Sequence, residues 1–175
     1  LLGHSEGGMI APMVAADDRR VRAVVLMAGT ASNGRRINAV QNVELMDRQK
    51  ATPTQVDSVM KLLPAMQDSL AARNPWFRFW LDYDPIPTAR RLRAPTLILQ
   101  GDTDRQVPAH EATMLATAIR EGGNTAVTLR VFPRINHLFL RDPQGSPAGY
   151  GDLPSKQVPA EVLGPLADWL ASQLR

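Results

Sequence analysis

Ser5 stands in a Gly-x-Ser-x-Gly motif, residues 3–7, a pattern typical of a nucleophilic serine held at a sharp strand-to-helix turn. The flanking glycines lack the Cβ atoms that would collide where the strand and the helix approach each other. Such a turn points the helix N-terminus at the serine hydroxyl. The backbone N–H of Glu6 is therefore predicted to stabilise the oxyanion formed from a bound ester. Alone, the motif also fits a Gly/Ser turn before a helix.

A serine nucleophile needs a base, and the sequence contains three histidines. His137 lies in the loop directly after a predicted strand, where a base can reach the serine, so we predict that it is the general base. Its structural alternative is an ordinary surface-loop histidine. His110 opens a predicted helix. His4 lies inside the motif, and its side chain is predicted to point away from the nucleophile.

The base in turn needs an orienting carboxylate, and two aspartates follow another predicted strand. We predict that Asp104 takes this role, because it lies further round the turn of residues 101–108 and can reach back toward the sheet. Asp102 is predicted to hydrogen-bond the local backbone of the turn. The order Ser, Asp, His along the chain is the order found in α/β hydrolases.

Alternating strands and helices must bring these residues together. Apolar runs predict buried strands of a parallel sheet at residues 21–29 and 94–101, and a third strand is predicted at residues 127–132. Helices are predicted at residues 6–16, 109–121 and 161–174. Pro12 is expected to bend the first helix or to shift its hydrogen bonds. The fold class is therefore α/β, with a mostly parallel sheet of about three strands.

Residues 30–73 interrupt this alternation. They are polar and carry helical spacing, which predicts two or three short helices and no strand. Thr52 is predicted to cap one of these helices, with Pro53 at its first position. We therefore expect residues 30–73 to form a helical insertion in a core made of residues 1–29 and 74–175.

An aromatic segment follows the insertion. Trp76, Trp80 and Tyr83 fall on one face of a short predicted helix. These three side chains are candidates for lining an acyl pocket. Packing of the insertion against the core explains them equally well.

Composition limits the class of protein. The 175 residues carry a net charge of +3, spread along the chain without interleaved aromatic residues, so we expect no nucleic-acid partner. No apolar run is long enough to span a membrane. Without cysteine there is no disulfide or thiolate site, and no other spacing suggests a metal or cofactor. A cytoplasmic location and a secreted or periplasmic one both stay open, as does the oligomeric state.

The three motifs together resemble those of bacterial α/β-hydrolase esterases, in the serine aminopeptidase-like group that includes EstD-type carboxylesterases. The motifs are Gly-His-Ser-Glu-Gly-Gly, Gly-Asp-Thr-Asp-Arg-Gln-Val-Pro and Asn-His-Leu-Phe. The resemblance implies Ser5 as nucleophile, Asp104 as acid and His137 as base. It also implies that residues 30–73 form a small cap over the site.

In that group, a second oxyanion N–H comes from a loop upstream of the serine motif. Only two residues precede the motif here, so we expect the sequence to be the C-terminal part of a longer enzyme, with the N-terminal half of the core missing. Such a part is expected to be weakly active alone.

The expected reaction is hydrolysis of a small-molecule carboxylic ester, with short acyl chains, through an acyl-enzyme and without a cofactor. Two alternatives remain at this stage. One is a serine peptidase of the prolyl oligopeptidase or aminopeptidase kind, which would use the same triad on amides. The other is a non-catalytic binding module with a hydrolase fold.

Overall fold

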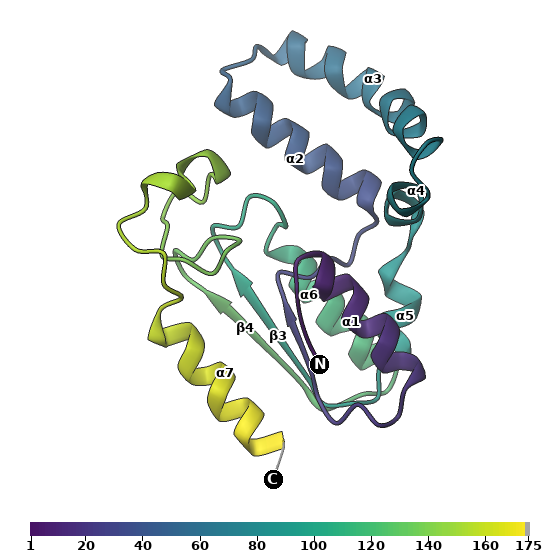
Figure 1. The fold of residues 1–175 in the computed structure, drawn as a ribbon, viewed down its shortest axis with the longest axis vertical. Helices are drawn as coiled ribbons and strands as arrows, with labels where there is room; N and C mark the ends of the chain where they lie inside the picture. Colours follow the sequence, from purple (N-terminus) through teal and green to yellow (C-terminus); the bar gives the residue numbers. More distant parts are fainter. Residues whose placement is uncertain (174–175) are drawn as a thin grey trace. The chain divides into compact units, whose positions relative to one another are not determined.

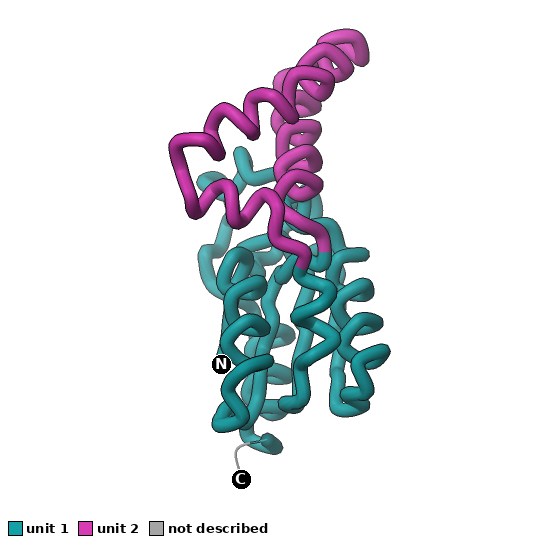
Figure 2. The backbone as a smooth tube through the Cα atoms, turned by 90° about the vertical axis from the view of Figure 1, so that its right-hand side faces the viewer, with its two compact units in different colours: residues 1–31, 85–175 teal, residues 32–84 magenta. Residues whose placement is uncertain are grey.

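The computed structural model describes residues 1–173, which form two compact units (Figure 2). The sheet unit contains residues 1–31 and the chain from residue 85 onward, and the helical unit contains residues 32–84. The predicted insertion, residues 30–73, is therefore too short at its C-terminal end. It misses a further helix that packs against the other helices of its unit.

The sheet has four parallel strands in sequence order: β1 (Leu2–His4), β2 (Val24–Met27), β3 (Thr96–Gly101) and β4 (Val127–Phe132). In register, Leu2 lies opposite Val25, and Leu97 lies opposite both Val25 and Thr128. The prediction of about three strands was one too few, because the short segment before Ser5 pairs with β2. The parallel α/β class itself is confirmed.

Helices cover both faces of this sheet (Figure 1). Three helices, α1 (Glu6–Asp17), α5 (Pro85–Arg91) and α6 (His110–Glu121), lie on one face, and α7 (Ala160–Gln173) lies on the other. Among them, α5 was not predicted, since two prolines in its first turn hide the helical pattern. Leu174, at the end of the predicted last helix, lies outside the described residues.

The two faces of the strands form two apolar cores. Val24, Leu26 and Ile98 pack toward α1, α5 and α6. Their neighbours in sequence, such as Val25 and Leu97, pack toward α7. Because successive side chains alternate between two buried faces, β2 and β3 are nearly continuous apolar runs.

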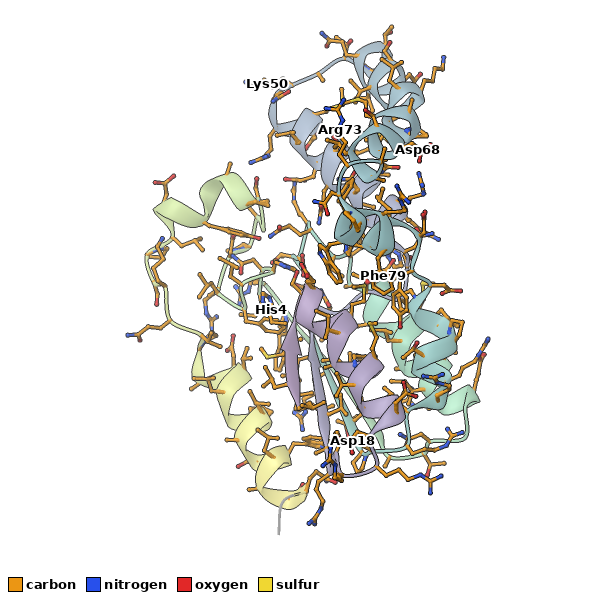
Figure 3. The ribbon with its side chains drawn as sticks, turned by 45° about the vertical axis from the view of Figure 1, so that its right-hand side comes forward. His4, Asp18, Lys50, Asp68, Arg73 and Phe79 are labelled. Atoms are coloured by element: carbon orange, nitrogen blue, oxygen red, sulfur yellow. The ribbon has the colours of Figure 1, made fainter. Side chains whose placement is uncertain are left out.

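The helical unit consists of α2 (Gly34–Arg48), α3 (Pro53–Ala71) and α4 (Pro75–Asp82). Its first two helices are long, not short as predicted. The predicted cap of α3 is confirmed as a capping box, in which Thr52 Oγ1 accepts from the Gln55 N–H and Gln55 Oε1 accepts from the Thr52 N–H. Arg35 of α2 forms ion pairs of 2.8 Å with Asp68 of α3, labelled in Figure 3, and with Asp82 of α4.

Within residues 1–173, no helix combines the length and the apolar character that a membrane crossing requires.

Candidate active site

Ser5 connects β1 to α1 in a strained backbone conformation, with φ 55° and ψ −114°. A residue with a side chain rarely adopts a positive φ, and such strain persists only where neighbouring contacts impose it. Here the Ser5 N–H donates to the Met27 carbonyl of β2 at 2.9 Å, and the Ser5 carbonyl accepts from the Gly8 N–H at 2.8 Å. The turn is thus fixed from both sides, and it presents the hydroxyl at the carboxyl end of the sheet.

Glycines permit the close approach of α1 to the sheet, although only one of the two predicted positions requires a glycine. A Cβ on Gly3 would overlap the Gly7 carbonyl, as the sequence predicts. A Cβ on Gly7 would meet no heavy atom within 4 Å. The second crowded position is Gly8, where a Cβ would lie 2.7 Å from the Gly29 Cα. The prediction for Gly7 was therefore wrong.

This difference provides a matched pair of variants. Gly3→Ala is expected to lower the free energy of unfolding by about 1–3 kcal/mol or more, because the added methyl group overlaps backbone that cannot move freely. Gly7→Ala adds the same methyl group in open space within a helix, so it should be neutral or stabilising by up to about 1 kcal/mol. Urea unfolding of the two variants beside the parent measures both effects. Equal destabilisation by the two substitutions would contradict this description of the turn.

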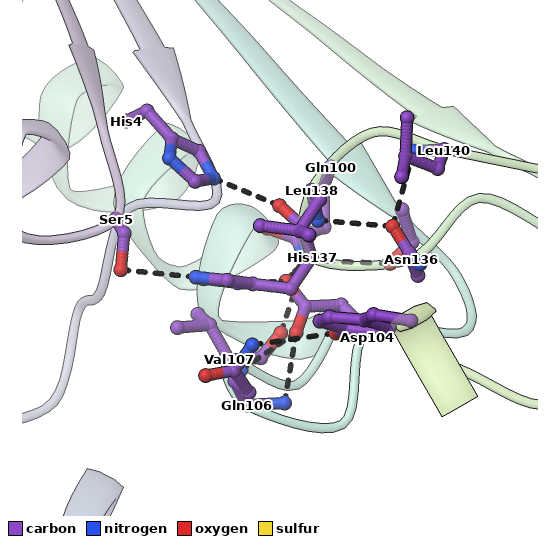
Figure 4. Close-up of polar contacts among 12 residues, drawn as sticks. His4, Ser5, Gln100, Asp104, Gln106, Val107, Asn136, His137, Leu138 and Leu140 are labelled. Carbon is purple, nitrogen blue, oxygen red and sulfur yellow. Dashed lines mark hydrogen bonds and ion pairs between the residues drawn. The ribbon is translucent and has the colours of Figure 1, made fainter. Parts of the chain in front are cut away.

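The imidazole of His137 lies between Ser5 and Asp104 (Figure 4). His137 Nε2 is 3.0 Å from Ser5 Oγ, and His137 Nδ1 is 2.8 Å from Asp104 Oδ2. A carboxylate can only accept, so Nδ1 carries the hydrogen and Nε2 is free to accept from the serine hydroxyl. His137 and Asp104 are both buried. His137 is therefore not an ordinary surface-loop residue, and the three predicted side chains lie in one hydrogen-bonded chain.

Asp104 accepts four hydrogen bonds, two on each carboxylate oxygen. Oδ1 accepts from the backbone N–H groups of Gln106 and Val107, at 2.8 and 2.9 Å. Oδ2 accepts from His137 and, at 3.0 Å, from the side-chain amide of Gln100. A buried carboxylate needs such partners in place of water. The four donors hold the carboxylate in place, and each of them requires it to act as an acceptor.

Asp102 has a different role from the one predicted. Its Oδ1 accepts from the Arg134 N–H at 2.6 Å, in the loop after β4, and not from the backbone of its own turn. Sequence proximity suggested a local bond, whereas β3 and β4 are adjacent and parallel, so the loops that follow them lie side by side. Asp102 thus ties the turn that carries Asp104 to the loop that carries His137.

Asn136 organises the loop around the base and was not predicted. It is fully buried, and its Oδ1 accepts from the N–H groups of Leu138 and Leu140 at 2.9 and 3.0 Å. Its amide nitrogen donates to Asp142 Oδ2 at 3.2 Å. The sequence signal for Gln100 is an amide within an apolar strand, and the signal for Asn136 is an amide directly before the base.

Comparison with known proteins places this chain in a family. Residues 1–150 match the sequence profile of the prolyl oligopeptidase family. The chain belongs to the prolyl oligopeptidase family. Esterase EstD of Thermotoga maritima is 25% identical over 177 residues, an alignment that covers 97% of this chain and 42% of EstD. The chain thus spans less than half the length of this curated relative.

Solved structures show the same fold as this prolyl oligopeptidase family chain. A Pyrococcus furiosus esterase, Pf2001, superposes with a TM-score of 0.55 at 12% identity, covering 99% of this chain and 53% of that one. Rv0554 from Mycobacterium tuberculosis gives a TM-score of 0.55 at 17% identity, covering 98% of this chain and 65% of that one. The four-stranded sheet is therefore part of an α/β-hydrolase fold.

The three predicted pocket residues of this family member lie in its helical unit. Each of Trp76, Trp80 and Tyr83 makes a ring contact with a phenylalanine of the same segment. The ring centroids are 5.5 Å apart for Trp76 and Phe79, 5.6 Å for Phe77 and Trp80, and 5.1 Å for Phe79 and Tyr83. Trp76 and Phe79 are exposed, and Phe79 is labelled in Figure 3. A role in an acyl pocket stays a prediction, as does the placement of the helices over the site.

Proposed function

We propose that this chain carries the catalytic triad of a serine hydrolase that cleaves carboxylic esters of short acyl chain. The observation behind the proposal is the hydrogen-bonded chain from Ser5 Oγ through His137 to Asp104. A nucleophile bonded to a base, which is bonded in turn to an orienting carboxylate, is the arrangement that activates a serine for acyl transfer.

In the proposed reaction, His137 Nε2 takes the Ser5 proton while Ser5 Oγ attacks the ester carbonyl carbon. The same nitrogen then returns the proton to the leaving alcohol, and an acyl-enzyme forms. His137 then takes a proton from water, whose oxygen attacks the acyl carbon, and gives that proton to Ser5 Oγ as the acid leaves and the serine hydroxyl is restored. Asp104 holds the imidazole tautomer and stabilises the imidazolium ion formed in each step.

The backbone N–H of Glu6 is proposed as one donor to the oxyanion. Glu6 is the first residue of α1, and the first N–H groups of a helix have no partner within the helix. The partial positive charge at this end of α1 favours the negative oxygen that develops in the transition state.

The name of the relative EstD supports esters as substrates. The family match supports a second candidate, a serine peptidase that uses the same three side chains on amide bonds. The chain spans only 42% of EstD. Ester hydrolysis by the whole protein is therefore also part of what we propose.

The two candidates are separated by assaying the full-length protein on p-nitrophenyl acetate, p-nitrophenyl butyrate and a panel of aminoacyl p-nitroanilides. Each kcat/KM is divided by the rate of uncatalysed hydrolysis, because activated esters react faster than anilides without any enzyme. We expect the larger enhancement for the esters. A larger enhancement for an anilide would support the peptidase, and no enhancement for either class would support the binding module.

A further inference from the structure

His4 directly precedes the nucleophile and contacts the backbone of the base. Its Nε2 lies 2.8 Å from the carbonyl oxygen of His137 (Figure 4). A carbonyl oxygen only accepts, so His4 Nε2 is the donor. The sequence predicts only that this side chain points away from the nucleophile, and the structure shows what it reaches.

Two adjacent residues therefore hold His137 at two separate atoms. Ser5 contacts the imidazole, and His4 contacts the main chain of the same residue. The His4 ring also lies 4.9 Å from the His137 ring and meets Phe139 edge-on at 6.0 Å, measured between centroids. These contacts join the turn that carries the nucleophile to the loop that carries the base, which are more than 130 residues apart in sequence.

We propose that His4 is a positioning residue, whose Nε2–H bond to the His137 carbonyl sets the reach of the base to Ser5. This proposal rests on the proposed function. Other ties of the base loop lead elsewhere: Asn136 bonds within the loop, Asp102 bonds it to the Asp104 turn, and the Tyr150 hydroxyl bonds the backbone of His137. The His4 bond is the side-chain contact that connects the loop's backbone directly to β1.

The environment of His4 favours a neutral imidazole at this position beside His137. Partial desolvation of the ring is the main reason why the pKa of His4 lies below the ordinary histidine value, and the neighbouring His137 lowers it further. The hydrogen bond to the His137 carbonyl and the negative charge of Asp104 act in the opposite direction. A neutral donor fixes the base without placing a positive charge beside the imidazolium ion that forms in the reaction.

His4 is only partly desolvated and the residue as a whole is exposed, so a substitution there can test positioning without opening a fully buried cavity. His4→Phe keeps a planar ring beside Phe139 and removes the donor. His4→Gln keeps a side-chain N–H at a similar reach. His110, an exposed histidine at the start of α6, provides the matched controls His110→Phe and His110→Gln.

The experiment measures the second-order rate of Ser5 labelling by a fluorophosphonate, kcat and KM for p-nitrophenyl butyrate, and the melting temperature of each full-length variant. We expect His4→Phe to slow labelling and lower kcat by about 10- to 100-fold, with KM and melting temperature little changed, since a misplacement near 1 Å can cost about 10²-fold. His4→Gln should recover most of the rate. Both His110 variants should match the parent.

Parental rates in His4→Phe would overturn the role of His4 alone. Equal losses in the Phe and Gln variants that follow a lowered melting temperature would also overturn it, because they indicate a structural role only. A parent protein that the probe does not label at Ser5 would overturn the proposed function, and with it this proposal.

Discussion

Replacing Ser5 by alanine is expected to lower kcat for p-nitrophenyl butyrate by on the order of 10⁶-fold, as removal of a serine nucleophile does in other hydrolases. The loss is large because no acyl-enzyme can form without Oγ, and His137 then has no proton to take from residue 5. KM should change little, since a single small atom is removed from the site. Steady-state kinetics of the full-length variant measures both constants.

Ser69→Ala is the matched control, an identical substitution at an exposed serine of α3. It should retain parental kcat. Circular dichroism of both variants checks that the fold is kept. A Ser5→Ala protein with kcat within tenfold of the parent would mean that another residue is the nucleophile.

Asp104→Asn is expected to lower kcat by about 10⁴-fold, the size of effect seen when the triad carboxylate of another serine hydrolase becomes an amide. Four donors surround the carboxylate, from Gln100, Gln106, Val107 and His137. An amide has only one acceptor oxygen. If that oxygen keeps accepting from the two backbone N–H groups, the NH₂ group of the asparagine faces His137 Nδ1. The imidazole is then forced into the wrong tautomer, with its hydrogen on Nε2 toward Ser5.

Asp102→Asn is the matched control, two residues away in the same turn. An asparagine at this position can still accept from the Arg134 N–H, so kcat should stay near the parental value. The pH profile of kcat/KM provides a second readout, since only the Asp104 variant alters the tautomer of the base. A larger loss from Asp102→Asn than from Asp104→Asn would mean that Asp102, and not Asp104, orients the base.

Much of the site could be predicted from the sequence because its parts follow buried strands. The apolar runs that became β2 and β3 are unambiguous, since helices cover both of their faces, whereas β4 is only partly buried and its sequence includes Thr128 and Arg130. Parallel strands end at the same sheet edge, so side chains that follow β3 and β4 must lie close to each other and to Ser5. That logic was sufficient for the positions of Asp104 and His137.

The contacts that could not be predicted depend on tertiary geometry with no sequence period. Gln100 is an amide inside an apolar strand, and its bond to Asp104 depends on the path of the following turn. The carbonyl that His4 reaches belongs to a residue 133 positions away. The α4 helix was assigned to the core because local spacing predicts a helix but not the unit against which it packs.

The central claim, that Ser5 is a nucleophile activated by His137, is tested most directly by identifying the residue that a fluorophosphonate modifies. The full-length protein is incubated with the probe, and the adduct is located by peptide mass spectrometry. We expect one adduct, on Ser5, that is lost in Ser5→Ala and forms far more slowly in Asp104→Asn. An unmodified Ser5, or an adduct on another serine, would contradict the claim.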